Sequence, residues 1–153
     1  MINKVLAMAV LWAAIVVSPT GALAQMPIPV IDRPGAVILA RTTIVALNHA
    51  NQTGNYAVLR DLGAPQFIVS NTPASLAESF RSLRQKQLEM GPVVMYDPVF
   101  AREPRVDQNG NLLLTGYFPT KPVRISFELL YTFVGTRWRL LGISVVANAK
   151  PMN

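Results

Sequence analysis

The spacing of apolar residues changes once along this chain, near Gly91 and Pro92, from the period of a helix to the period of a strand. Before that point, apolar residues recur three and four positions apart, which is typical of amphipathic helices. Beyond it, apolar and polar residues alternate, which is typical of strands with one buried face. The order predicts an α+β domain in which N-terminal helices pack on one face of a curved antiparallel meander sheet.

Three helices are expected in the first part. The first covers residues 36–52, with an apolar face that packs on the sheet. A short second helix covers residues 56–62, before the Gly-Ala-Pro sequence at 63–65 interrupts the chain. The third has the clearest start, because Thr72 can cap it and Pro73 fits the first helical position, where no amide proton is needed. Gly91 and Pro92 are expected to end it.

The first helix also has a polar side. Arg41 and Asn48 fall opposite the apolar stripe formed by Val37, Ala40 and Ile44. We therefore expect Arg41 and Asn48 to lie away from the sheet.

Four extended segments follow. Asn109 and Gly110 predict a two-residue type I′ turn, since both tolerate positive φ angles. Gly135 and Thr136 predict a second tight hairpin. The expected strand regions are an interrupted one over 93–106, then 112–118, 123–134 and 137–146.

The N-terminus resembles a cleavable export signal. Lys4 precedes an apolar run over residues 5–17, and Ala22-Leu23-Ala24 offers the small residues that a signal peptidase needs. We expect residues 1–24 to be removed by a cut between Ala24 and Gln25, which delivers the protein to a bacterial periplasm or beyond. Because the apolar run is shorter than the roughly 20 residues that span a bilayer, no stable membrane anchor is expected after cleavage.

The rest of the chain divides by composition. A Pro-rich leader over residues 25–35 precedes one domain over 36–149, and residues 150–153 form a tail. The chain contains no cysteine, which excludes disulfides, a thiolate nucleophile and a thiolate metal site. Packing and hydrogen bonds must stabilise the domain.

The formal net charge of +6 comes from scattered cations. Arg137 and Arg139 flank Trp138 and offer a contact for anionic components of the cell envelope, although such a pair can also protect an edge strand. No nucleic-acid recognition motif accompanies the charge, so nucleic acid is not an expected partner.

Short motifs resemble the NTF2-like superfamily, which has a cystatin-type cone fold. They are Thr53-Gly-Asn-Tyr56 at a helix end, Ala77-x-x-Phe80 in a Pro-started helix, and the terminal meander Gly135-Thr-Arg-Trp-Arg-Leu-Leu-Gly-Ile143. The resemblance covers residues 36–147. Two stretches, 114–120 and 138–143, are most similar to secreted bacterial members without a defined activity.

The resemblance implies where catalytic residues would lie. Isomerase-like members carry a carboxylate base near the third helix, but residues 67–75 contain no Asp or Glu. Dehydratase-like members use a histidine with a carboxylate partner, whereas this chain has only His49, flanked by Asn48 and Asn51. Without a positioned partner, His49 is expected to be a surface or capping residue rather than a general base. A lone histidine also predicts no metal site.

The remaining candidates have structural interpretations. Asp61 is expected to be a surface charge beside Arg60, and Asp97 to stabilise a turn before Pro98. Glu128 falls opposite the aromatic face of its strand and would enter a cone only in a reversed register. The aromatic residues of the meander are expected to fill the core, or else to line a pocket for an apolar ligand: Tyr117, Phe118, Phe127, Tyr131, Phe133 and Trp138.

These observations predict an exported, noncatalytic NTF2-like domain that binds a small apolar ligand or serves as an assembly module, with a homodimer through its open sheet face as one form. No cofactor, metal or catalytic residue is assigned, and the ligand-binding residues are not identified. The alternatives are a cofactor-independent isomerase or dehydratase, and a basic protein that binds the cell envelope. Fold resemblance alone does not select among them.

Overall fold

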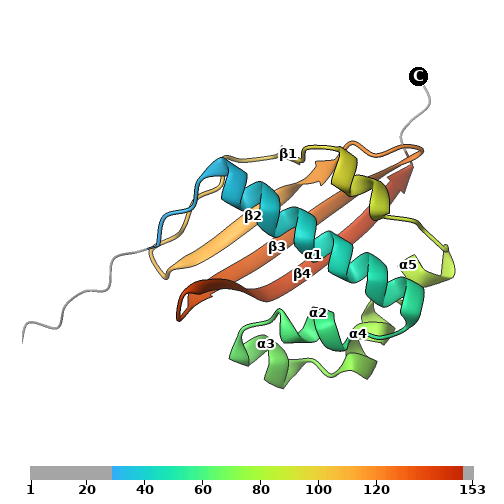
Figure 1. Cartoon of the computed structure of the whole chain (residues 1–153), viewed down its shortest axis with the longest axis horizontal. Helices are drawn as coiled ribbons and strands as arrows, with labels where there is room; N and C mark the ends of the chain where they lie inside the picture. The colour runs from blue at the N-terminus through green and yellow to red at the C-terminus, as the bar shows by residue number, and fades with distance from the viewer. Residues whose placement is uncertain (1–28, 150–153) are drawn as a thin grey trace, which may run out of the picture.

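A computed structural model describes residues 29–149 of the chain (Figure 1). The predicted signal and its cleavage position between Ala24 and Gln25 lie outside the described residues, as do residues 25–28 and the tail. Within them, the elements follow in the order α1 (Arg33–Thr53), α2 (Ala57–Asp61), α3 (Pro65–Ser70), α4 (Pro73–Ser79), α5 (Arg81–Gln85), the 3-10 helix η1 (Gly91–Met95), β1 (Val99–Phe100), β2 (Asn111–Phe118), β3 (Val123–Val134) and β4 (Arg137–Ala149).

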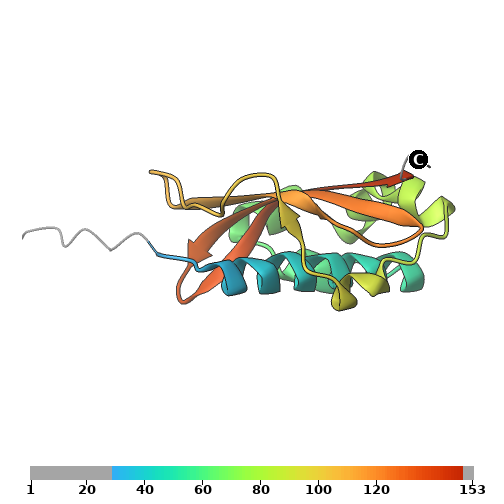
Figure 2. The same cartoon turned by 90° about the horizontal axis from the view of Figure 1, so that it is seen from above.

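The strands form one antiparallel meander in the order β1-β2-β3-β4. The long helix α1 crosses one face of this sheet (Figures 1 and 2). The predicted α+β order of helices first and an antiparallel meander second is therefore confirmed. The sheet is open and is neither closed nor strongly curled, so the strong curvature expected of a cone is not found.

The core lies between the helices and the sheet, with α1 covering the middle strands. Alternation along β3 directs Ile125, Phe127, Leu129 and Tyr131 toward α1, and all four are buried. The apolar stripe of α1 meets them with Ala36, Ala40, Ile44 and Leu47, which are fully buried.

Of the six aromatic residues expected to fill this core, three are buried in it and Trp138 packs against it while partly buried. Phe118, Phe127 and Tyr131 are buried as predicted. Phe133 is 39% exposed and pairs with Trp138 across the last hairpin, their ring centroids 5.2 Å apart. The remaining member, Tyr117, lies on the opposite sheet face, where the guanidinium of Arg124 sits 4.3 Å from its ring centroid.

The first helix begins earlier than expected. The Asp32 side chain accepts a hydrogen bond of 2.8 Å from the amide of Gly35 and so caps α1, while Pro34 occupies the first turn without losing a needed amide proton. The helix therefore includes the last three residues of the segment that was expected to be an extended leader. Gly54 ends the helix with a φ of 72°, as the Thr-Gly-Asn sequence predicted.

The start of α4 agrees with prediction, whereas its end does not. The Thr72 hydroxyl accepts from the Ser75 amide, and the Ser75 hydroxyl accepts from the Thr72 amide, which completes a capping box. The helix divides at Phe80, and its second part, α5, ends at Gln85, before Gly91 and Pro92.

Two short elements contradict the predictions. The second helix ends before residues 63–65 as predicted, but Pro65 stands in the first turn of a further helix, α3, which was not expected. Residues 91–95 form η1, a helix, although a strand was predicted from residue 93 onward. The strand expected over 93–106 is reduced to β1 and a single bridge from Val106 to Leu112.

The first hairpin turn differs from the predicted type. Gly110 has a φ of 77°, but Asn109 is not among the described residues with positive φ, so the turn is not type I′. The Asp107 carboxylate accepts bonds of 2.8 Å from the amides of Asn109 and Asn111 and holds the turn. The second hairpin is tight as predicted, with Val134 paired to Arg137 and a φ of 63° at Gly135.

The connection between α2 and α3 is bonded to the backbone of β4. The Leu140 amide donates to the Leu62 carbonyl at 3.1 Å, and the Ala64 amide donates to the Leu140 carbonyl at 2.7 Å. These bonds place α2 and α3 beside β4 at the edge of the sheet (Figure 1).

Candidate functional site

The predicted polar side of α1 is largely covered by the chain around η1. Arg41 donates to the carbonyls of Val93 at 3.3 Å and Tyr96 at 2.8 Å, and to the Asp97 carboxylate at 2.9 Å. Asn48 is only 3% exposed. A polar stripe therefore faces protein rather than solvent, because its side chains satisfy backbone groups of a segment that has few hydrogen bonds of its own.

Three of the sequence candidates lie apart from one another. His49 is exposed, as predicted, on the outer side of α1. Asp61 is exposed and its carboxylate lies 3.3 Å from the guanidinium of Arg60. Glu128 is exposed on the sheet face opposite α1, paired in register with Thr115 and Ser144, so it does not enter the core. No general-base pair results from these three.

Asp97, Arg137 and Arg139 differ in the contacts that they make. Asp97 accepts from Arg41 where a turn-stabilising role was predicted. Arg139 donates to the carbonyl of Asp61 at 3.3 Å, at the end of α2, whereas Arg137 is exposed at the hairpin. The structure thus directs one of these two arginines toward a backbone carbonyl.

An apolar groove runs along the outer side of α1, between α2 and η1. Its volume is about 600 Å³. Three exposed apolar side chains from two elements form its walls: Val58 of α2 is 64% exposed, Val94 of η1 is 54% exposed, and Leu62 beyond α2 is 38% exposed. Val45 and Ala46 of α1 form its floor. The first helix is thus apolar on two sides, one toward the sheet and one toward this groove.

Most polar side chains that line the groove already form hydrogen bonds within the protein. The Thr42 hydroxyl donates to the Ile38 carbonyl at 2.8 Å, and the Thr53 hydroxyl donates to the His49 carbonyl at 2.7 Å. Arg41 is held by the bonds to η1 and its neighbours. The surface offered to a ligand is therefore mainly hydrocarbon, and His49 also lines it.

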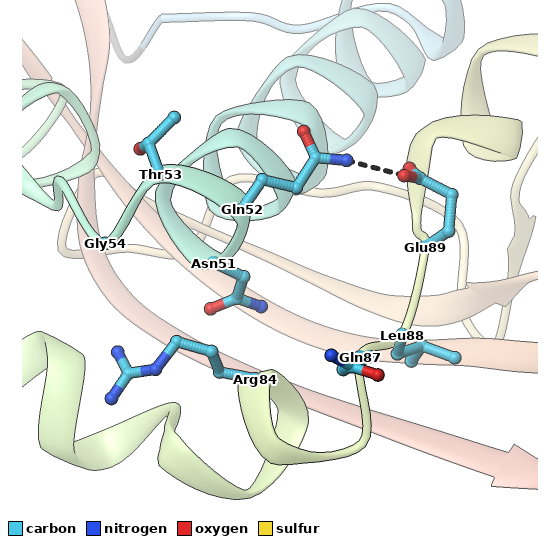
Figure 3. A pocket seen from close by; sticks show the side chains of 8 residues that line it. All are labelled: Asn51, Gln52, Thr53, Gly54, Arg84, Gln87, Leu88 and Glu89. Carbon is cyan, nitrogen blue, oxygen red and sulfur yellow. Dashed lines mark hydrogen bonds between the residues drawn. The ribbon is translucent and has the colours of Figure 1, made fainter.

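A second, polar pocket of about 430 Å³ lies at the C-terminal end of α1, facing the segment after α5 (Figure 3). It was not predicted, because its key carboxylate, Glu89, stands in a segment without periodicity. The Glu89 carboxylate accepts from the Asn48 amide group at 2.7 Å, the Gln52 amide group at 2.5 Å and the Gly91 backbone amide at 2.6 Å.

These hydrogen bonds favour the charged form of Glu89. The bond from the Gly91 backbone amide is the main cause that holds the pKa of Glu89 below its ordinary value of 4.5, followed by the bond from Asn48. The Asn48 carbonyl oxygen in turn accepts from the Met90 amide at 2.9 Å. Asn48 and Glu89 thus join α1 to the segment before η1.

Between residues 29 and 149, no three His, Asp or Glu side chains gather closely enough to hold a metal ion. In the same part of the chain, no helix combines the length and the apolar character needed to cross a membrane. What the structure defines is an α+β protein with N-terminal helices and a four-stranded antiparallel sheet. No family model, curated protein or solved structure matches the chain.

Proposed function

We propose that the protein is an exported, noncatalytic binding domain that holds a small apolar ligand in the groove along the outer side of α1. The observation that carries this proposal is the exposure of Val58, Leu62 and Val94 around one hollow of about 600 Å³. Contiguous exposed apolar surface rimmed by polar residues is typical of binding sites. The volume falls in the range of small-molecule pockets, about 300–1,000 Å³.

The groove favours a hydrocarbon chain or ring with one polar end. Its floor and walls are aliphatic, and the hydroxyls of Thr42 and Thr53 are bonded to backbone carbonyls of α1. His49, which also lines the groove, can contact a polar end group. Burial of the ligand's apolar area supplies the affinity, at about 25 cal/mol per Å² removed from water before the costs of binding.

A binding role is better supported than the isomerase or dehydratase alternative. Acid–base catalysis on an apolar substrate needs a positioned acid or base with a partner. The described residues that line the groove include His49 but no Asp or Glu. An assembly module would instead use the same groove to bind a second protein chain. Native mass spectrometry distinguishes a bound chain from a small ligand.

We also infer a distant relationship to the NTF2-like superfamily. The order of elements and the packing of α1 on one sheet face support a distant likeness to the NTF2-like class, while the open sheet departs from its cone. Export rests on the residues before the described part of the chain. Intact-mass analysis of protein expressed from the full sequence should give a chain that starts at Gln25; a chain that retains Met1 would remove the exported part of the proposal.

The groove is tested by a pair of matched substitutions. Val58→Glu places a charge in the groove, whereas Val69→Glu places the same charge on α3, where Val69 is 85% exposed and outside the groove. Sodium decanoate and 1-decanol, titrated into isotopically labelled protein, should shift the amide resonances of α1, α2 and η1. Val58→Glu should abolish these shifts and Val69→Glu should keep them.

Other results would reject the proposal. Equal binding by both variants would place the ligand elsewhere. A different result would identify the groove as a protein interface: native mass spectrometry shows a dimer, Val58→Glu dissociates it, and decanol does not bind. The small-ligand proposal then fails.

A further inference from the structure

The polar pocket contains a buried amide group without a partner. Asn51 is 9% exposed, and its Nδ2 atom has no hydrogen-bond partner among the described residues. Figure 3 shows its side chain between Gln52, Arg84 and Gln87, at the pocket. Buried polar groups in proteins are nearly always paired, so an orphaned amide needs an explanation.

The hydrogen bonds from Arg84 to Tyr56 and from Tyr56 to Asn51 fix the orientation of the Asn51 amide group. The Arg84 guanidinium, which can only donate, lies 3.3 Å from the Tyr56 hydroxyl. The Tyr56 hydroxyl must then give its proton to the Asn51 Oδ1 atom, 2.6 Å away. If the amide were turned over, Arg84 and Asn51 would both donate to a hydroxyl whose own proton had no acceptor. The contacts therefore leave Nδ2 as the free atom, and it requires an acceptor.

The pocket also carries one charge of each sign. The Glu89 carboxylate is bonded to neutral donors, and no Lys or Arg forms an ion pair with it among residues 29–149. Arg84 is partly buried, and its side-chain bond in the same range goes to the neutral Tyr56. Neither charge is therefore neutralised by an ion pair within this range.

A strained residue also lines the pocket, between Arg84 and Glu89 in the sequence. Gln87 has a φ of 48°, the left-handed region that side-chain-bearing residues rarely adopt, and it connects α5 to the segment that carries Glu89. Strained backbone of this kind concentrates at binding sites, where it is retained because it positions neighbouring groups.

We propose that this pocket binds a small zwitterion of the α-amino acid class. The carboxylate of the ligand accepts from Asn51 Nδ2 and pairs with Arg84, and its ammonium group pairs with Glu89. A simple anion would satisfy Asn51 and Arg84 but would be repelled by Glu89, and a simple cation would leave the Asn51 amide unpaired. Thr53 lines both this pocket and the apolar groove, but the inference does not depend on the function proposed for the groove.

The test uses protein expressed from the full sequence, with glycine and L-alanine as probes, and acetate and methylammonium as half-ligands. Calorimetric titration should detect the amino acids, with each half-ligand bound at least about tenfold more weakly, because each loses one charge-assisted contact. Asn51→Asp replaces the free donor with an acceptor at the same size. It should weaken amino-acid binding by about tenfold or more, whereas Asn109→Asp, the same change at the exposed hairpin, should not.

A second variant keeps the test decisive if Asn51→Asp fails to fold. Glu89→Gln should weaken glycine binding and strengthen acetate binding, since the repulsion is removed. Acetate binding as tight as glycine binding in the unmodified protein would overturn the zwitterion assignment. Absence of binding by every probe would overturn the proposal and leave ordered water as the partner of Asn51.

Discussion

The hydroxyl of Tyr131 on β3 lies 2.7 Å from the hydroxyl of Thr43 on α1 and donates to the Leu39 carbonyl at 3.0 Å. Since Tyr131 gives its one proton to Leu39, the Thr43 hydroxyl must donate to Tyr131. This bridge joins the long helix to β3 within the core. Tyr131 is 2% exposed and Thr43 is 3% exposed.

Tyr131→Phe should lower the free energy of unfolding by about 1–3 kcal/mol, because it leaves the Leu39 carbonyl and the Thr43 hydroxyl buried without their partner. Urea denaturation measures the loss. Tyr117→Phe removes a hydroxyl from the opposite sheet face and should stay within about 0.5 kcal/mol. Equal losses in the two variants would contradict the importance of the bridge.

The free energy of unfolding should also fall at alkaline pH, because Tyr131 is harder to deprotonate in the folded state than in the unfolded state. Burial raises the pKa of Tyr131 above its ordinary value of 10.0, against a smaller opposite effect of the bond from Thr43. The folded state therefore holds this proton more tightly than the unfolded state. Its contribution is complete below pH 10.0 and is lost as pH rises above that value. Urea denaturation at pH values on both sides of 10.0 should show a steeper decline for the unmodified protein than for Tyr131→Phe.

Acid should weaken the fold through Glu89, whose pKa is lowered from 4.5 by hydrogen bonds from Gly91 and Asn48. The folded state binds this proton less readily than the unfolded state, so the contribution is present above pH 4.5 and is lost as pH falls through the lower, folded pKa. In Glu89→Gln that part of the acid dependence should be absent. Glu128→Gln, on the opposite sheet face, is the control; an identical pH profile for the two variants would refute the assignment.

Gly116→Ala should destabilise the protein by about 1–3 kcal/mol, as overpacking does. A Cβ at Gly116 would lie 2.3 Å from the Val99 carbonyl oxygen and 3.0 Å from the Phe100 Cα atom, and backbone cannot swing aside as a side chain can. Gly142→Ala is the matched control, since its nearest neighbour would be the Leu130 Cβ at an ordinary 3.5 Å. Thermal unfolding should separate the two; similar melting temperatures would show that β1 moves away freely.

Arg41 and Asp97 should have unequal effects although they form one ion pair. Arg41→Met removes bonds to the carbonyls of Val93 and Tyr96 and should cost about 1.5–3 kcal/mol. Asp97→Asn changes a carboxylate whose side chain is 87% exposed and should cost less than about 1 kcal/mol. Urea denaturation of both variants checks this order, and the reverse order would show that the exposed ion pair dominates.

The order of helices and strands could be read from the sequence because each long element has a regular pattern. The caps at Thr72 and Gly54 and the hairpin at Gly135 depend on local chemistry and were located correctly. Residues 93–95 were misassigned because a short apolar run fits a strand and a helical turn equally well. The Gly-Ala-Pro sequence at 63–65 correctly predicts the end of α2, but proline is compatible with both a turn and a helix start, so it does not reveal that α3 begins there.

The candidate sites were beyond sequence reasoning for a different reason. Asn48 and Glu89 are 41 positions apart and meet only because the segment before η1 folds back along α1. Likewise, the groove walls at Val58 and Val94 belong to separate elements whose packing no local pattern specifies. The interpretation of His49 as a surface residue needed only its own surroundings, and the structure places it there.

The backbone hydrogen bond from the Leu140 amide to the Leu62 carbonyl has a consequence for the proposed binding role. Leu62 forms part of the groove, and its carbonyl is fixed to a strand that is itself paired along its length with β3. One wall of the groove is therefore preorganised before any ligand arrives. A molecule that settles against Leu62 does not have to order that wall, so more of its burial energy is retained as affinity.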